Sequence, residues 1–285
     1  MIKNQKIILN WSNEMKNLIV VRGGGDLATG TIYKLYKCGF SVLILETEHP
    51  SAIRRNVAFS EAVYQETQTV EDVTCYFSKT LEEAKRFLSE GKLTVIIDPK
   101  GIAIQELKPF AVVDAILAKK NLGTTKEMAP ITIALGPGFT AGIDADAVIE
   151  TKRGHNLGKV LWNGSAAPNT GIPGIIGGYG KERVLHSPAA GILRNIKQIT
   201  DTVEKDEVIA VIETEQGNIP VKATLSGLLR GLIRDGYPVT CGFKIADIDP
   251  RADEYNNCFT ISDKARCIAG GVLEAIIQLK GERGL

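Results

Sequence analysis

The feature that most constrains the fold is a run of three consecutive glycines, residues 23–25, between a β-branched segment and a helical one. Residues 18–21 (LIVV) have the continuous apolar character of a buried strand. Residues 26–38 (DLATGTIYKLYKC) have the pattern of a helix, and Asp26 is of a residue type that caps helices. The sequence therefore predicts a strand that turns sharply into a helix.

The glycines fit the G-x-G-x-x-A pattern of dinucleotide-binding turns, with its fixed positions at Gly23, Gly25 and Ala28. A second apolar run, residues 41–46 (SVLILE), ends in Glu46, 21 residues after Gly25, where a carboxylate usually binds a ribose. This predicts an α/β fold that begins with a Rossmann-like, mostly parallel sheet domain. The residues expected to bind a nucleotide here are Gly23, Gly24, Gly25, Asp26 and Glu46.

Strand-like and helical patterns alternate up to about residue 135. The further strands are expected at residues 72–77, 93–98 and 131–135, and the further helices at residues 80–91 and 108–121. Thr80 and Glu83 have the spacing of a capping box at the start of the first of these helices. Strands that alternate with helices indicate a mostly parallel sheet.

Composition excludes several classes of function. The 285 residues are 44% hydrophobic and 24% charged with a net charge of +1, so no overall field favours nucleic acid or an acidic membrane. No apolar run is long enough to span a bilayer, and residues 1–17 lack the pattern of a signal peptide. Five scattered cysteines without a pairing pattern are expected to be buried, inert thiols, and we expect a cytoplasmic protein without a metal site.

Glycine becomes frequent between residues 129 and 183, interleaved with β-branched and aromatic residues, which favours an ordered module rich in turns. The expected domains are a Rossmann-like domain at residues 1–128, the glycine-rich module at 129–183, a β domain at 184–250 and a C-terminal helix at 251–285. Ser262 or Asp263 is the expected cap of that helix, and Ile268, Val272 and Ile276 form its apolar stripe.

The β domain contains an internal repeat, because the segment from Gly191 aligns without gaps on the segment from Gly227. Each copy reads as strand, turn, strand, and the pair resembles the barrel-sandwich hybrid of lipoyl and biotinyl carrier domains. In those domains the hairpin between the halves presents a modified lysine. Here the tip is Gln216-Gly217-Asn218 and Lys222 lies beyond it, so no covalent cofactor is expected.

Two segments outside the glycine loop carry candidate chemistry. Residues 135–142 (LGPGFTAG) offer backbone N–H groups and hydroxyls that suit an anion-binding nest or a plain tight turn, through Gly136, Gly138 and Thr140. The stretch after Glu150 places Arg153 and His155 on one face if it is extended. Arg153 could bind phosphate or carboxylate and His155 could transfer a proton, or both could be solvated turn residues.

Residues 163–174 (NGSAAPNTGIPG) bring amide and hydroxyl groups to a loop, among them Asn169 and Thr170. These groups suit hydrogen bonding to a heterocycle, and they equally suit ordinary turns. Arg22, directly before the glycines, either favours an anionic ligand or pairs with a carboxylate at the rim of the sheet.

Four segments together resemble the accessory proteins of selenium-dependent molybdenum hydroxylases, of the YqeB type. The segments are residues 21–30 (VRGGGDLATG), 134–160, 163–174 and 246–251 (ADIDPR). The resemblance implies a role in making or inserting a molybdenum cofactor, with a molybdenum hydroxylase as partner. It also implies that Thr140, Arg153 and His155 stand in signature segments.

The leading hypothesis is therefore a maturation factor that handles a nucleotide or molybdopterin-type cofactor and forms a homo-oligomer. Both a dinucleotide and a molybdopterin dinucleotide contain a pyrophosphate. In either case the pyrophosphate would bind in the same way, at the start of the helix after the glycines. The alternatives are an NAD-dependent oxidoreductase, with Glu46 selecting NAD and His155 as proton donor, and a non-catalytic nucleotide-binding scaffold.

Overall fold

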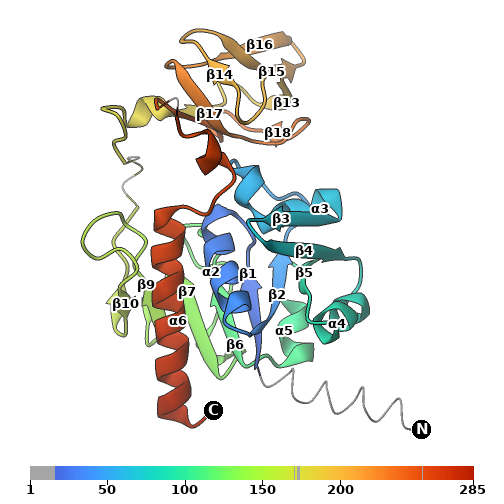
Figure 1. Ribbon diagram of the computed structural model, residues 1–285, viewed down its shortest axis with the longest axis vertical. Coiled ribbons are helices and arrows are strands. Elements are labelled where there is room, and N and C mark those ends of the chain that lie inside the picture. The colour runs from blue at the N-terminus through green and yellow to red at the C-terminus, as the bar shows by residue number, and fades with distance from the viewer. Residues whose placement is uncertain (1–16, 170, 172–173, 252) are drawn as a thin grey trace. The chain divides into compact units, whose positions relative to one another are not determined.

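The computed structural model describes residues 17–169, 171, 174–251 and 253–285, which form two units (Figure 1). Unit 1 takes the described residues within 1–50, 58–169 and 261–285, and unit 2 takes those within 51–57 and 170–260. The domain boundaries expected at residues 128, 183 and 250 are not tested by this division into two units and stay predictions.

A nine-stranded mixed sheet organises unit 1, in the order β10-β9-β7-β6-β1-β2-β5-β4-β3. Its strands are β1 (Leu18–Arg22), β2 (Ser41–Glu46), β3 (Thr67–Val70), β4 (Val73–Ser78), β5 (Leu93–Ile97), β6 (Ala111–Asp114), β7 (Ile131–Leu135), β9 (Ala147–Ile149) and β10 (Val160–Leu161). The seven strands from β9 to β4 are parallel, and the antiparallel strands β10 and β3 close the two edges.

Helices cover both faces of this sheet. The helices α4 (Leu81–Ser89) and α5 (Ile102–Leu107) pack on the face that carries Leu18 and Val20. The helices α2 (Asp26–Lys37) and α6 (Asp263–Arg283) lie side by side, and α6 covers Ile149 on the opposite face (Figure 1). The short helix α3 (Ala62–Gln65) follows a 3₁₀ turn.

Two of the sequence-predicted helix starts are confirmed. The Thr80 hydroxyl accepts the N–H of Glu83 (3.2 Å) at the start of α4, as the capping box predicts. Ser262 caps α6 through the N–H of Ala265 (3.2 Å). The predicted stripe of α6 is fully buried, at Ile268, Val272 and Ile276.

The predicted fold class, a Rossmann-like domain joined to a carrier-like barrel-sandwich hybrid, is wrong. In the sheet of unit 1, β5 lies between β2 and β4, and antiparallel strands extend it to nine. The helix expected at residues 108–121 is instead β6 followed by an irregular connection, because four apolar residues after Pro109 are too few for strand periodicity to stand out. No α-helix therefore connects β6 to β7 among these described residues.

The glycine-rich segment begins in unit 1 with a small layer on the sheet. Strands β8 (Thr140–Ala141) and β11 (Gly164–Ser165) form a two-stranded sheet. Phe139, Ala141, Ala145 and Ala166 pack with strands β7 and β9 in one apolar cluster. This layer lies on the face opposite α6, since Ala134 and Val148 point into it.

Unit 2 consists of two separate four-stranded antiparallel sheets, in the orders β12-β19-β17-β14 and β16-β15-β13-β18. The strands are β12 (Val184–His186), β13 (Gly191–Asn195), β14 (Thr202–Val203), β15 (Val208–Thr214), β16 (Gly217–Lys222), β17 (Gly227–Leu232), β18 (Pro238–Val239) and β19 (Lys244–Asp249). One apolar core, which includes Leu193, Ile212, Leu229 and Ile248, joins the sheets. Lys222 ends β16, beyond the tight turn that follows Thr214.

The two repeat copies meet the same packing constraint. A side chain at Gly191 would lie 2.3 Å from the carbonyl oxygen of Glu213, and one at Gly227 would lie 2.3 Å from that of Asp249. Only glycine tolerates so close a strand approach. Each copy also has an ion pair at equivalent positions, and the two pairs differ in burial. The Arg194–Glu213 pair is exposed, whereas the carboxylate of the Arg230–Asp249 pair is fully buried.

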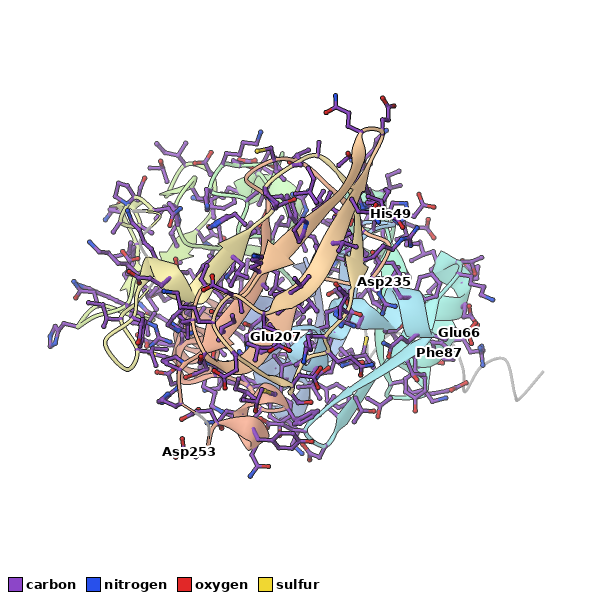
Figure 2. All side chains as sticks on the ribbon, turned by 90° about the horizontal axis from the view of Figure 1, so that it is seen from above. His49, Glu66, Phe87, Glu207, Asp235 and Asp253 are labelled. Carbon is purple, nitrogen blue, oxygen red and sulfur yellow. The ribbon has the colours of Figure 1, made fainter. Side chains whose placement is uncertain are left out.

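The buried Asp249 carboxylate receives two arginines. It accepts hydrogen bonds from Arg251 (3.0 and 2.9 Å) and from Arg230 (3.2 Å). Burial alone would raise the pKa of Asp249, but these hydrogen bonds and positive charges outweigh it and hold the pKa below its usual value. Beside the exposed pair of the first copy, the N–H of Asn195 donates to Asp235 (2.7 Å; labelled in Figure 2).

The cysteines are free thiols, and the expectation that all are buried is wrong for three of them. Cys75 and Cys258 are buried, whereas Cys38, Cys241 and Cys267 are exposed. Desolvation raises the pKa of the Cys75 thiol, which favours its uncharged form.

Gly30 sets the approach of α2 to α6, because a side chain there would lie 2.8 Å from the backbone of Ala265. We expect Gly30→Ala to lower the free energy of unfolding by about 1–3 kcal/mol, despite the higher helix propensity of alanine. Gly270→Ala is the matched control, since the nearest atom is the Lys34 ammonium at 3.7 Å, and it should stabilise by up to about 1 kcal/mol. Urea unfolding measures both, and equal effects would contradict the close contact.

Asp249 should make the stability of the protein depend on pH in the acid range. Because its folded pKa lies below the unfolded value of about 3.9, its stabilisation is complete above that value and disappears as the pH falls through the folded pKa. We expect Asp249→Asn to lower the Tm at pH 7 and to reduce the further loss between about pH 4 and pH 2. Glu213→Gln, at the exposed equivalent position, is the control. Parallel Tm profiles for Asp249→Asn and the parent would refute this assignment.

Candidate functional site

The loops that carry most of the candidate residues leave the sheet at one edge. In the parallel register Arg22 pairs with Leu45 and Asp114, and Leu135 pairs with Ile149. The segments that follow β1, β2, β6, β7 and β9 therefore emerge together at the carboxyl edge. The chain continues from β1 to β2 on one side and returns to β6 on the other, so this is a switch point of the sheet, where ligands of open α/β sheets bind.

The three glycines of the loop have three different environments. Gly23 has a positive φ of 92°, and a side chain there would lie 3.0 Å from the backbone of Ile116. Gly24 is covered by Ser60, whose N–H donates to the Gly24 carbonyl oxygen (2.9 Å). Gly25 has an ordinary φ of −68°, and a side chain there would meet no atom within 4 Å. Of the three, only Gly25 leaves space for a ligand at the N-terminus of α2.

Glu46 braces this loop from the end of β2. Its carboxylate accepts the N–H of Gly24 (2.8 Å) and the N–H of Thr47 (2.8 Å). Burial raises the pKa of Glu46, and these two hydrogen bonds partly oppose the rise. A ribose hydroxyl would therefore have to share a carboxylate that already holds the loop.

Arg22, which directly precedes the glycines in the sequence, is part of a buried polar cluster. Its guanidinium lies 3.5 Å from the Asp114 carboxylate, and the two side chains are 3% and 1% exposed. Thr124 accepts a hydrogen bond from Arg22 and donates one to Asp114 (2.5 Å). The second nitrogen of Arg22 donates to the carbonyl oxygens of Leu122 (3.3 Å) and Pro99 (3.4 Å). Of the two sequence interpretations of Arg22, the structure shows pairing with a carboxylate.

The start of α6 brings Lys264 near Asp26, in the first turn of α2. Arg153 forms a two-pronged ion pair with Asp263 (3.0 and 3.2 Å). Lys264 is half-buried next to it; burial and the nearby Arg153 lower its pKa, while Asp26 and Glu150 act in the opposite direction. The attraction between Lys264 and Asp26 places this lysine in the electrostatic surroundings of the first turn of α2.

The glycines of the second candidate turn are packed against the protein. Side chains at Gly136 and Gly138 would lie 2.7 Å from the Thr151 hydroxyl and 2.6 Å from the Cα of Lys120. The N–H of Thr140 donates to Asp144 (2.7 Å), and its hydroxyl lies 3.1 Å from that of Ser165. Other segments of the protein therefore occupy the space beside these glycines, where a ligand would have to approach the backbone.

The stretch that carries His155 is not extended, so the condition under which Arg153 and His155 would share a face is not met. Hydrogen bonds from Leu157 to Gly154 (3.1 Å) and from Lys159 to Asn156 (3.0 Å) fold it into consecutive turns, with His155 exposed. Asn169 is exposed in the following loop, and Thr170 lies outside the described residues.

Buried Glu150 organises these loops from the end of β9. Its carboxylate accepts the N–H of Lys152 (2.7 Å) and the N–H of Ala167 (2.8 Å). It therefore fixes the starts of the two segments that carry the histidine and the exposed asparagine. A carboxylate that holds two backbone amides acts as a positioning group.

Sequence reasoning missed Asp114, Thr124 and Lys264. Asp114 ends a short β-branched run, as Glu46 does, and that signal was hidden by the wrong helix at residues 108–121. Thr124 and Lys264 lie in a loop and a helix whose positions at the carboxyl edge depend on the tertiary fold.

Within the part of the chain that the structure describes, no helix combines the length and apolarity that a membrane crossing requires. Within the same residues, no three histidine, cysteine or acidic side chains are grouped to hold a metal ion.

The chain is similar in sequence to a known protein over most of its length. It is 51% identical over 262 residues to "Uncharacterized protein YqeB" of Escherichia coli (strain K12), which supports kinship with YqeB-type proteins. The matched stretch is 92% of this chain and 48% of that protein, so the chain spans about half the length of its curated relative. No family model matches the chain.

Similar solved structures have names of the aspartoacylase and succinylglutamate desuccinylase type. An aspartoacylase family protein from Mesorhizobium loti is 12% identical over 82% of this chain and 85% of that chain, with a TM-score of 0.29. A succinylglutamate desuccinylase/aspartoacylase from Rhodobacter sphaeroides is 11% identical over 83% of this chain and 86% of that chain, with a TM-score of 0.27. Likenesses this low carry no conclusion about function.

The buried polar cluster around Arg22 predicts a large effect of one substitution. Asp114→Ala leaves the Arg22 guanidinium buried without its carboxylate, and we expect a loss of about 3–5 kcal/mol in the free energy of unfolding. Asp72→Ala, which removes the exposed pair with Lys37, should change stability little. Denaturant unfolding compares the two variants, and a small effect of Asp114→Ala would show that the buried pair is not needed.

Proposed function

We propose that this chain is an accessory protein that handles a nucleotide or molybdopterin-type cofactor in the maturation of a selenium-dependent molybdenum hydroxylase. The kinship with YqeB-type proteins and the four signature segments support this proposal. The observation that carries it is the open position at Gly25, at the N-terminus of α2 and at the switch point of the parallel sheet.

The residues at this edge fit the phosphate-bearing end of such a cofactor. The first-turn N–H groups of α2 and the positive end of its dipole favour an anionic group. Lys264 lies near the same turn, and a side chain at Gly25 would fill the space that the ligand needs. The cofactor would supply the redox chemistry, and this chain's groups would bind and orient it.

The oxidoreductase alternative is less well supported. It requires a proton donor at the site, and its candidate, His155, is exposed in a turn. It also relies on Glu46 to bind a ribose, although that carboxylate accepts the N–H groups of Gly24 and Thr47. We propose a cytoplasmic location and a homo-oligomer for the maturation factor, with the apo-hydroxylase as its partner.

Gly25→Val tests this proposal, because the ordinary φ of Gly25 and the open space allow the side chain without strain. We expect the variant to fold and to retain about tenfold less cofactor than the parent after expression with molybdate and selenite. Mass spectrometry of the small molecules released from the purified protein measures retention. Hydroxylase activity in cells that depend on this chain should fall in parallel.

Gly281→Val is the matched control, since a side chain at Gly281 on α6 also meets no atom within 4 Å. Equal retention by Gly25→Val and Gly281→Val would exclude the glycine loop as the binding site. Release of a nicotinamide dinucleotide alone would favour the oxidoreductase.

A further inference from the structure

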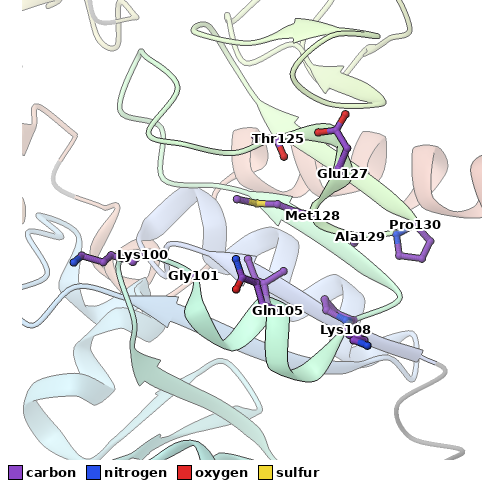
Figure 3. Close-up of a pocket in the computed structure, with 11 residues that line it drawn as sticks. Lys100, Gly101, Gln105, Lys108, Thr125, Glu127, Met128, Ala129 and Pro130 are labelled. Carbon is purple, nitrogen blue, oxygen red and sulfur yellow. The ribbon is translucent and has the colours of Figure 1, made fainter.

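A cavity of about 850 Å³ lies in unit 1 between α5 and the segment that leads into β7 (Figure 3). Among the described residues, no α-helix connects β6 to β7, and the cavity lies beside the short helix α5. This volume is within the range of small-molecule sites. The carboxyl-edge site described above does not include this groove.

Both walls of the cavity are attached to the sheet. Asp98 at the end of β5 accepts the N–H of Ala103 (2.8 Å), which holds the first turn of α5. On the other wall, the Thr132 hydroxyl donates to the carbonyl oxygen of Lys126 (3.1 Å). Arg283 donates to the carbonyl oxygen of Pro130 and to the carboxylate of Asp146 (2.7 Å). The groove is therefore formed by two independently anchored walls.

Apolar groups form the floor and the walls. Ile104, Pro109, Met128, Ala129 and Pro130 line the cavity, and Gln105 and Met128 lie on its facing sides (Figure 3). Ile104 belongs to the buried core beneath, against which Met128 packs. A methionine wall adapts to differently shaped apolar ligands.

The charged lining is predominantly positive. Lys100 and Lys108 stand at the two ends of α5, and Glu127 is on the opposite wall. Among the described residues, none of these three forms an ion pair. Lys108 has a left-handed φ of 47°, although it precedes Pro109, a combination that sterics disfavour.

We propose that this cavity is a binding site for an amphipathic organic anion, with its apolar body against Ile104 and Met128 and its acidic group at Lys108. The apolar lining, the anchored walls and the two lysines, which have no ion-pair partner among the described residues, together carry the proposal. The site does not depend on the function proposed for the glycine loop.

Two fluorescent probes with the same aromatic body test the proposal. Anilinonaphthalene sulfonate carries an anionic group, and phenylnaphthylamine is its uncharged counterpart. We expect one sulfonate probe to bind per chain of 285 residues, more tightly than the uncharged probe. Gln105→Trp, at an exposed position on the rim, fills the groove and should weaken both probes by about tenfold or more.

Lys108→Gln separates the charge from the apolar contact. It should weaken the binding of the sulfonate probe by about fivefold and leave the binding of the uncharged probe unchanged. Lys37→Gln, at an exposed pair elsewhere in unit 1, should alter neither. Circular dichroism confirms that each variant is folded. Sulfonate binding that is insensitive to both Gln105→Trp and Lys108→Gln would overturn the proposal, as would equal affinity for the two probes.

Discussion

The ion pair between Arg22 and Asp114 joins the two halves of the large sheet at the place where its strand order reverses. Both side chains are almost completely buried, so the pair is stable only because Thr124 and the carbonyl oxygens of two loops satisfy the remaining donors. The loops after β1, β5 and β6 are thereby held at one edge. The glycine turn begins directly after Arg22, so its first residue is attached to this buried pair.

Each glycine of that turn has its own physical reason. Gly23 is required by a positive φ and by the nearby backbone of Ile116, and Gly24 by the segment that covers it. Gly25 is required by neither, and this is why it marks the place for a ligand. The same distinction applies to Gly136 and Gly138, where the protein's own segments fill the space.

Local signals in the sequence predicted the elements that contain them. The capping residues Thr80 and Ser262 and the stripe of α6 were identified correctly, because capping and periodicity act within a few residues. The strand β6 was missed, because four apolar residues satisfy the patterns of a helix and of a buried strand equally well. That error hid Asp114. The fold class was wrong for another reason, because the position of β5 between β2 and β4 follows from long-range strand pairing.

The sequence by itself determined the strand, glycine turn and helix at residues 18–37, the repeat in unit 2 and the terminal helix. Only the tertiary structure decided that β5 lies between β2 and β4, that Arg22 is paired with Asp114, and that Lys264 lies near the start of α2. Turns, caps and apolar periodicity are set by neighbouring residues. The carboxyl-edge site is assembled by packing between segments that lie far apart in the sequence, which no local pattern encodes.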